Sequence, residues 1–365
     1  MEPELKQQLI EAAALAPSAD NSQPWLYRWN DETLELWIDS TRSGSISDQR
    51  FVLSDLAIGC CIENIAICAH AHNHKCHVTY LPSPDTEPLW AASLTFLPTS
   101  EQHTPLVFYI PKRHTNRSFP WKGPVIDATK QTLSDEAKKQ EGITLHWLNG
   151  TPHYKMALKA MWLAESLRFG TKELHQELFS SIRFEVGNHT TSQEGLAPAT
   201  LSIEPPMRPL FKLLRHWKIM RLLNWVGGNY LIGFRSAVLP TLLSPALALL
   251  TIKQTDRANI IMAGQTLQRV WLNATMHGLS LQPFAAAGIF SLGFIQTPTT
   301  PPLRRQKIGT LIKTISPHDH GLILLRMGHA TRDNRAIHNQ RRSISSFSKT
   351  SVHCQDSLQP RLPTD

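Results

Sequence analysis

Two carboxamides and a hydroxyl stand close together near the start of the chain, in a loop bounded by two prolines. The stretch from Ala16 to Trp25 reads APSADNSQPW, and Ser18, Asn21 and Gln23 are its polar members of interest. Such groups offer both hydrogen-bond donors and acceptors, so they can pair with an amide-like heterocycle. A structural alternative is a turn in which these groups satisfy the backbone while Trp25 packs in the core.

A second group of residues suits an anion. In the stretch RHTNRSF, Arg113 and Arg117 flank Thr115. Guanidinium groups supply planar bidentate donors for phosphate oxygens, and the threonine hydroxyl adds a further hydrogen bond. A basic surface turn would have the same composition, so the pattern by itself leaves both interpretations open.

A third group consists of histidines and a cysteine. In a strand, His70, His72, His74 and Cys76, with His77 beside them, would place four metal-ligand types on one face. A helix C-terminus, where the first two imidazoles diverge and favour the helix dipole, is the alternative that we prefer. We predict no metal site. The segment 227–233 (GGNYLIG) is not a G-x-G-x-x-G fingerprint, and G-x-S-x-G, H-E-x-x-H and Walker motifs are lacking.

The composition is that of an ordinary globular protein. Of 365 residues, 41% are hydrophobic and 18% charged, and the net charge is +8. Without a zinc-finger, RNP or bZIP pattern this modest excess does not indicate nucleic-acid binding. Five cysteines without a C-x-x-C pair, and no recognisable signal peptide, predict a cytoplasmic protein. The apolar run 237–252 contains two prolines and is too short to span a membrane, so we expect it to be buried.

The first part of the chain predicts alternating helices and strands. Apolar periodicity indicates a helix over 4–15 that ends before Pro17. Short strand-like segments follow at 26–29 and 34–38. The segment 53–72 is apolar on nearly every face, which is typical of a central buried helix. Two more strands are expected at 76–81 and 91–97.

The second part repeats the long helix. Gly264 to Gly278 aligns without gaps on Gly59 to Asn73, which indicates an internal duplication with a long period. Helices are also expected at 154–169 and 173–184. The excursion at 187–244 is rich in Pro, Gly, Arg and apolar residues. We interpret it as a lid, because Trp217 and Trp225 within it argue against disorder.

The first loop resembles the nitroreductase signature A-P-S-x-x-N-x-Q-P-W, which contacts FMN across a dimer interface in that family. The resemblance assigns FMN contacts to Pro17, Ser18, Ala19, Asn21 and Gln23. The segment Arg113, His114, Thr115 and Arg117 resembles the family's N-terminal R-[RH]-[ST]-x-[RK] element, which binds the phosphate and ribityl groups. Here that element stands where a second copy would begin.

Two further segments resemble the same family. The stretch 278–286 (GLSLQPFAA) is similar to the family's G-L-x-x-x-P-x-x-G segment, which implies FMN contacts for Pro283, Phe284, Ala285 and Ala286 through backbone N–H groups near flavin N5. The family often carries a Glu there, and the alanines exclude that carboxylate role. The closing strand at 325–329 (LRMGH) is followed by Arg341 and Arg342, which the resemblance makes phosphate contacts and which otherwise suit a solvated surface.

The resemblance implies an α+β, nitroreductase-like fold, with a mixed sheet wrapped by helices and two fused halves that form a pseudo-dimer around one FMN site. The expected organisation is a first half at 1–110, a second half at 111–345 that carries the lid at 187–244, and a flexible tail at 346–365. Within the family the chain looks closest to the fused, lid-bearing Acg type, which the stretch from Glu165 to Gly195 also resembles.

The expected function is that of an FMN-dependent oxidoreductase of the nitroreductase type, with NAD(P)H as the transient reductant and weak turnover beneath the lid. No side chain is assigned a catalytic role, because the flavin carries the chemistry. The alternative from another class is an FMN storage or sequestering protein. A third hypothesis is peripheral membrane attachment through the basic, apolar segment 207–225. We expect small-molecule partners, no transmembrane span, and a monomer, with a homodimer as the alternative.

Overall fold

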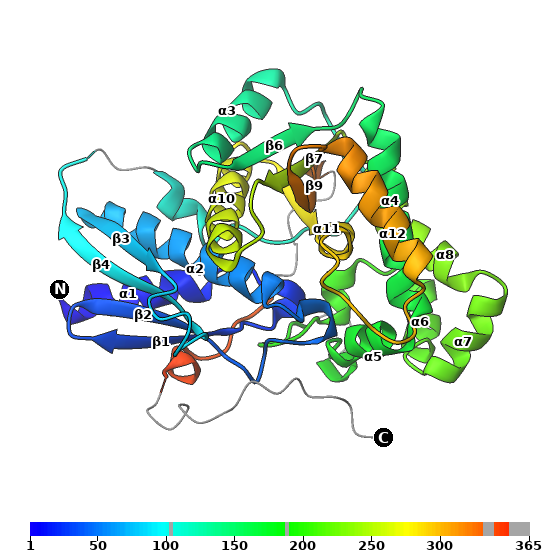
Figure 1. The fold of residues 1–365 in the computed structure, drawn as a ribbon, viewed down its shortest axis with the longest axis horizontal. Helices are drawn as coiled ribbons and strands as arrows, with labels where there is room; N and C mark the ends of the chain where they lie inside the picture. Colours follow the sequence, from blue (N-terminus) through cyan, green and yellow to red (C-terminus); the bar gives the residue numbers. More distant parts are fainter. Residues whose placement is uncertain (102–104, 187–189, 331–338, 350–365) are drawn as a thin grey trace. The chain divides into compact units, whose positions relative to one another are not determined.

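The computed structural model describes residues 1–101, 105–186, 190–330 and 339–349 (Figure 1). The chain is divided into two compact units, and its path passes between them four times. Unit 1 comprises Met1–Arg113, Asp256–Leu272 and the segment from Arg341 onward, and unit 2 comprises His114–Thr255 and Asn273–Gln340. Because each unit is discontinuous in sequence, contacts between distant segments hold it together.

Unit 1 combines a small sheet with buried helices. Helix α1 (Pro3–Ala14) buries Leu9, Ala12 and Ala13 and ends ahead of Pro17, as the periodicity predicts. The sheet has the order β1-β2-β4-β3 and is antiparallel throughout. Its strands are β1 (Trp25–Asn30), β2 (Thr33–Ile38), β3 (His74–Tyr80) and β4 (Trp90–Pro98). The predicted strands of the first part are thus confirmed within a few residues.

Two long helices of equal length pack together in unit 1. They are α2 (Val52–Ala71) and α10 (Arg257–Met276), of which unit 1 contains the first 16 residues of α10. A Cβ added at Gly59 would meet the carbonyl of Ile261 at 1.9 Å, and one added at Gly264 would meet that of Leu56 at 2.2 Å. Only glycine permits this close approach of two backbones.

Side chains across this helix pair form buried polar contacts. Asp55 accepts two hydrogen bonds from Arg257 at 2.8 and 2.9 Å. Further along, the Arg269 guanidinium pairs with Glu63 at 2.6 Å, and the amide of Gln268 donates to Asn64 at 2.7 Å. Helix α2 is long and apolar enough to cross a membrane by length and composition, but its side chains are almost all buried inside the protein.

Unit 2 is built around the central strand β9 (His320–Ala330). Its sheet has the order β5-β9-β7-β6, and β8 also pairs with β9. The other strands are β5 (Trp121–Lys122), β6 (Ile143–Trp147), β7 (Ala246–Ile252) and β8 (Ser280–Phe284). Every residue of β7 is buried, as expected for the apolar run 237–252, but Leu242 and Leu243 in the same run are 49% and 40% exposed. The helices that pack around this sheet include α3 (Asp127–Lys138), α4 (His153–Gly170), α11 (Ala286–Ser291) and α12 (Pro302–Ile315).

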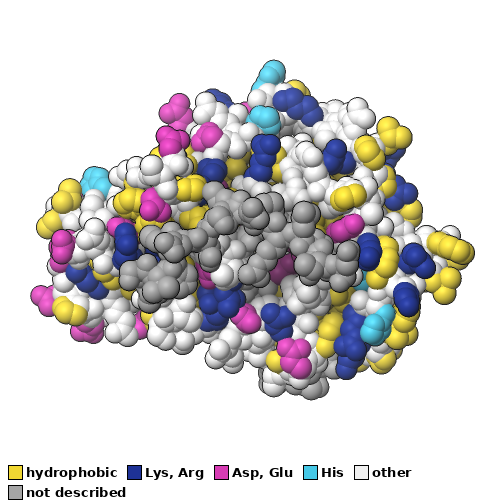
Figure 2. Space-filling model, turned by 60° about the horizontal axis from the view of Figure 1, so that its bottom comes forward, with side chains coloured by type: hydrophobic (Ala, Val, Ile, Leu, Met, Phe, Trp, Pro, Cys, Tyr) yellow, Lys and Arg dark blue, Asp and Glu magenta, His cyan; other side chains and the backbone are white. Residues whose placement is uncertain are grey.

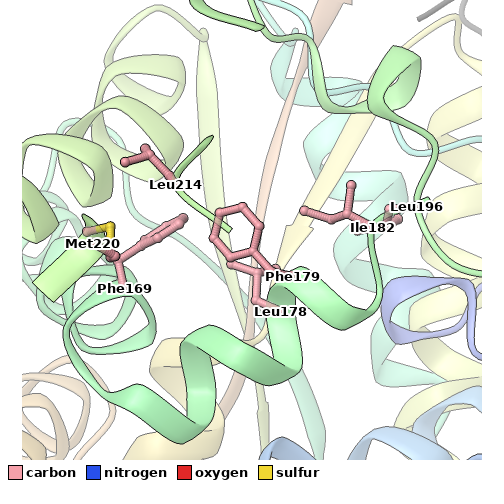
Figure 3. Close-up of a cluster of buried hydrophobic side chains, with 7 residues drawn as sticks. All are labelled: Phe169, Leu178, Phe179, Ile182, Leu196, Leu214 and Met220. Carbon is pink, nitrogen blue, oxygen red and sulfur yellow. The ribbon is translucent and has the colours of Figure 1, made fainter. Parts of the chain in front are cut away.

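The insertion is helical rather than loop-rich. Its described part from 190 to 244 contains α6 (Arg208–Leu213), α7 (Trp217–Trp225), α8 (Gly228–Gly233) and α9 (Leu239–Leu242), and residues 187–189 lie outside the described residues. Helices α6, α7 and α8 share a core with α4 and α5 (Lys172–Ser180), which Figure 3 shows around Phe179. The core is formed by Phe169, Leu178, Phe179, Ile182, Leu196, Leu214 and Met220.

Two details of the fold differ from the expectation. The α+β class is confirmed, but all described strand pairs are antiparallel, whereas a mixed sheet was predicted. Parallel pairing is confined to isolated bridges, such as Tyr27–Ser348 and Thr115–Leu281. The start of the predicted tail is also ordered by packing, because Phe347 is fully buried against Trp25 and Tyr27. Residues 350–365 of that tail lie outside the described residues.

Candidate functional site

The first polar loop adopts a constrained conformation in unit 1. Asp20, Asn21 and Gln23 all have left-handed backbone angles, with φ of 49°, 57° and 51°. Such angles are uncommon for residues other than glycine and persist only when surrounding contacts enforce them. Here the hydroxyl of Ser18 accepts a hydrogen bond from the backbone N–H of Gln23 at 3.0 Å, which closes the loop.

The carboxamides of this loop bond to the protein itself. Gln23 is fully buried; its Nε2 donates to the carbonyl of Asn21 at 3.2 Å, and its Oε1 accepts from the backbone N–H of Arg342 at 3.0 Å. Asn21 Oδ1 accepts from Arg341 at 2.9 Å. Within this structure, therefore, these two side chains brace the loop, and the hydroxyl of Ser18 keeps its own proton to donate.

Arg341 joins the loop to the end of α1. Its guanidinium donates to the carbonyls of Ala14 and Ala16, both at 3.0 Å, as well as to Asn21. These are carbonyls that the end of a helix leaves without an intrahelical donor, and a cation there also favours the helix dipole. Burial lowers the pKa of Arg341 to about 10. The arginines predicted near the chain end thus lie beside the loop predicted near its start.

Arg113 lies at the same helix end with its charge uncompensated. It is 6% exposed, donates to the carbonyl of Leu15 at 3.1 Å, and stacks over the ring of Trp271 with its Cζ 4.5 Å from the centroid. Its Nε has no hydrogen-bond partner and no described carboxylate forms an ion pair with it. Burial, together with the charge of Arg341, lowers its pKa to about 9.

Unit 1 therefore assembles three of the segments that the sequence selected: the loop from Pro17 to Gln23, Arg113, and the pair Arg341 and Arg342. They are far apart in the chain and meet around the C-terminus of α1. A buried guanidinium with an unused N–H and no carboxylate partner is suited to bind an anion, because the anion would relieve its desolvation.

Unit 2 contains the rest of the predicted residues. The chain after Arg113 runs beside β8, where Thr115 forms a bridge with Leu281 and the backbone N–H of Asn116 donates to the Leu281 carbonyl at 3.2 Å. Arg117 donates to the carbonyl of Thr200, in the insertion, at 3.4 Å. His114, Thr115 and Arg117 are each partly buried.

The strand β8 leads directly into α11 at the predicted backbone contact. Pro283 and Phe284 end the strand, Ala285 is the N-cap, and Ala286 begins the helix. The first N–H groups of a helix have no intrahelical acceptor, so they are available to an acceptor atom of a ligand. A Cβ on Gly288 would meet the carbonyl of Leu322 at 1.9 Å, so this glycine lets α11 pack directly on β9.

Arg326 is a residue of unit 2 that sequence reasoning did not select as a site residue. It is fully buried on β9, donates to Gln282 at 2.8 Å and to the carbonyl of Ser118 at 2.8 Å, and lies over the ring of Trp121. Burial, then the charges of Arg117 and Arg235, lowers its pKa to about 9. An arginine inside the apolar run LILLRMG was the available signal.

Two other predicted features are placed as follows. Among the described residues, no group of three or more His, Cys, Asp or Glu is arranged to hold a metal ion. His70 lies in the last turn of α2, 3.9 Å from Glu101, and His74 begins β3.

In the insertion, Trp217 packs against His175 with their ring centroids 5.2 Å apart, whereas Trp225 is 83% exposed. Trp217 thus belongs to the core of the insertion.

Comparison with known proteins finds relatives in Mycobacterium tuberculosis. No family model matches the chain. It is 27% identical over 298 residues to "Uncharacterized protein MT1398", covering 80% of this chain and 40% of that protein. It is 28% identical over 280 residues to "Putative NAD(P)H nitroreductase acg", covering 74% of this chain and 77% of that protein. The chain thus spans less than half the length of the first relative and about three quarters of the second.

One solved structure that is similar to this chain is the FMN-dependent nitroreductase NfnB from Mycobacterium smegmatis, determined in complex with NADPH. It is 16% identical, and the match covers 67% of this chain and 96% of that one with a TM-score of 0.36.

Proposed function

On the premise that this chain is a relative of the nitroreductase family, we propose that it binds FMN and acts as an NAD(P)H-dependent oxidoreductase. The observation that carries the proposal is the buried Arg113, whose Nε has no partner and whose charge no described carboxylate balances. A dianionic phosphate ester would supply what this site lacks. The family resemblance selects the same residue independently.

The residues present fit the cofactor in chemistry. We assign phosphate binding to Arg113 and Arg117, with Thr115 donating through its hydroxyl. Ser18 and the backbone of the strained loop are assigned to the polar edge of the ring system, while Gln23 and Arg341 act by holding that loop in its left-handed conformation. The N–H groups of Ala285 and Ala286 are assigned to the neighbourhood of flavin N5.

Bound FMN would supply the hydride and electron transfer between a reduced nicotinamide and an acceptor. The chain's own residues bind and orient the cofactor: they hold its phosphate, fix the edge of its ring system and exclude water. No side chain is required as an acid or base, which agrees with the alanines at 285 and 286 in place of a carboxylate.

We also propose that the chain arose by fusion of two nitroreductase-like copies. Position 59 and position 264 differ by 264 − 59 = 205, and the same offset relates the bounds of α2 to those of α10. It also exchanges the two glycine contacts, Gly59 on Ile261 and Gly264 on Leu56. In an isologous interface each contact has such a reciprocal partner.

The polar contacts of the two helices obey the same exchange. Under that offset the pair Asn64–Gln268 becomes Glu63–Arg269, and both pairs are present. This reciprocity supports a pseudo-two-fold relation between the copies, with halves near 1–110 and 111–345. We propose that the insertion 187–244 covers the flavin as a lid and makes turnover weak.

The test is an absorption spectrum of the purified chain, followed by anaerobic addition of NADH or NADPH. Binding of one FMN per chain and bleaching of the flavin band by a reduced nicotinamide are the expected results. Failure of the chain to bind FMN at all would refute the proposed function. Bound FMN that neither nicotinamide reduces would instead favour the storage protein.

A further inference from the structure

We propose that the outer surface of the insertion binds an anionic phospholipid bilayer. The relevant surface, here called the α6–α8 surface, consists of the outward-facing residues of α6, α7 and α8. Its most exposed apolar side chains are Leu222 at 66%, Trp225 at 83%, Val226 at 81% and Leu231 at 70%. Phe108 and Leu303 are as exposed but stand singly elsewhere in the chain, whereas these four lie within one short stretch, and such a gathering marks an interaction surface.

Helix α7 divides its two faces between the core and this surface. Met220 is fully buried in the core of the insertion, and Asn224 donates to the carbonyl of Phe169 at 3.1 Å. These two side chains fix the inner face. The opposite face carries Lys218, Arg221, Leu222 and Trp225, which follow the helical spacing i, i+3, i+4 and i+7, and all four are exposed.

The charge of this region is of one sign. From Pro205 to Thr255 the sequence contains no Asp or Glu, whereas α6, α7 and their connection carry Arg208, Lys212, Arg215, Lys218 and Arg221. An open hollow of about 750 Å³ beside α7 is lined by Lys172, His216, Trp217, Lys218, Ile219 and Arg221. Figure 2 shows basic and apolar side chains intermixed at its right-hand edge, the side on which α7 and α8 lie in Figure 1.

The arrangement favours a lipid surface over a protein partner. Basic residues interleaved with Leu and Trp are suited to the boundary between anionic headgroups and acyl chains, where the cations meet phosphates and the apolar side chains enter the bilayer. Tryptophan suits this boundary because its ring is apolar and its N–H is polar. A protein interface of ordinary composition would deplete its centre of lysine.

The experiment is vesicle flotation of the full-length chain. One set of vesicles is phosphatidylcholine alone, and the other contains about 30% phosphatidylglycerol. We expect binding to the anionic vesicles only, and release at about 1 M salt, where the Debye length is about 3 Å. Lys218→Gln/Arg221→Gln should weaken binding roughly 25-fold, at about fivefold for each cation removed near the surface. Leu222→Ser/Trp225→Ser should weaken it more than tenfold.

The matched control lies in unit 1, where Phe108 is 68% exposed and Lys112 is exposed. Phe108→Ser/Lys112→Gln should leave flotation unchanged. Equal binding to both vesicle types, no binding of the wild-type chain, or equal losses in the control and α7 variants would overturn the proposal. So would self-association that disappears in Leu222→Ser/Trp225→Ser while the wild type ignores vesicles, since a second copy would then be the partner. None of these outcomes depends on FMN.

Discussion

Replacing Arg113 with methionine separates cofactor binding from fold stability. The side chain is buried with one carbonyl partner and an unused Nε. Its pKa falls from 12.5 to about 9, which corresponds to a cost of roughly 5 kcal/mol for keeping the charge in the free protein. Arg113→Met removes that cost and one hydrogen bond of about 1 kcal/mol, so the free protein should be as stable as the wild type or more stable.

FMN binding should respond in the opposite direction. Losing a hydrogen-bonded cation at the phosphate costs about 1.5–3 kcal/mol, which corresponds to a Kd roughly 10 to 150 times weaker. Riboflavin, which lacks the phosphate, should bind the variant and the wild type almost equally. Fluorescence titration with both ligands measures the Kd values, and thermal unfolding without ligand measures stability.

Two control variants sharpen this test. Lys112→Met removes an exposed neighbouring cation and should change neither quantity. Arg341→Met should instead lower stability and weaken FMN and riboflavin together, since it releases Ala14, Ala16 and Asn21. An FMN Kd for Arg113→Met within twofold of the wild type would refute the assignment, and so would equal losses for FMN and riboflavin.

Three further predictions concern stoichiometry, packing and pH. Titration of the chain should saturate at one FMN, because each of the two binding motifs occurs once; saturation at two would reject the single site. Gly264→Ala should destabilise the protein by more than about 2 kcal/mol in chemical denaturation, because its Cβ would meet the Leu56 carbonyl at 2.2 Å. Gly278→Ala is the control: its Cβ would meet no atom within 4 Å, so it should cost only the strain of its left-handed backbone, about 1 kcal/mol. Burial lowers the pKa of His175, so the folded chain favours the neutral imidazole. The stability that this side chain contributes is therefore present above the unfolded pKa of about 6.5 and is lost as pH falls below that value. The melting temperature should therefore fall from pH 7 to pH 5 less steeply in His175→Gln than in the wild type.

The helices and strands of the first part could be predicted because their patterns are local. The span of α1 and the all-round apolar character of α2 follow from residues within a few turns. The insertion could not be predicted in the same way. Its helices α6 and α8 have six residues each, too short to be stable alone, and they form because the core around Phe179 holds them.

In the candidate site, too, local patterns could be predicted and long-range contacts could not. The loop and the arginines carry a sequence pattern, so their residue types could be selected in advance. That Gln23 bonds to Arg342, and that Arg113 and Arg341 share one helix end, depends on contacts between segments hundreds of residues apart. Arg326 has no motif around it, and only its partners Gln282 and Ser118 reveal what it holds.

The interleaved path of unit 1 has a consequence for synthesis on the ribosome. Helix α2 is among the first elements to emerge. Its glycine face is covered by α10, whose part in unit 1 is complete only at Leu272. The arginines that contact the end of α1 come after Gln340. At about 5–20 residues per second, the α10-facing side of α2 stays uncovered for on the order of ten to forty seconds. The nascent chain therefore presents a nearly uncharged apolar helix to its surroundings throughout that interval.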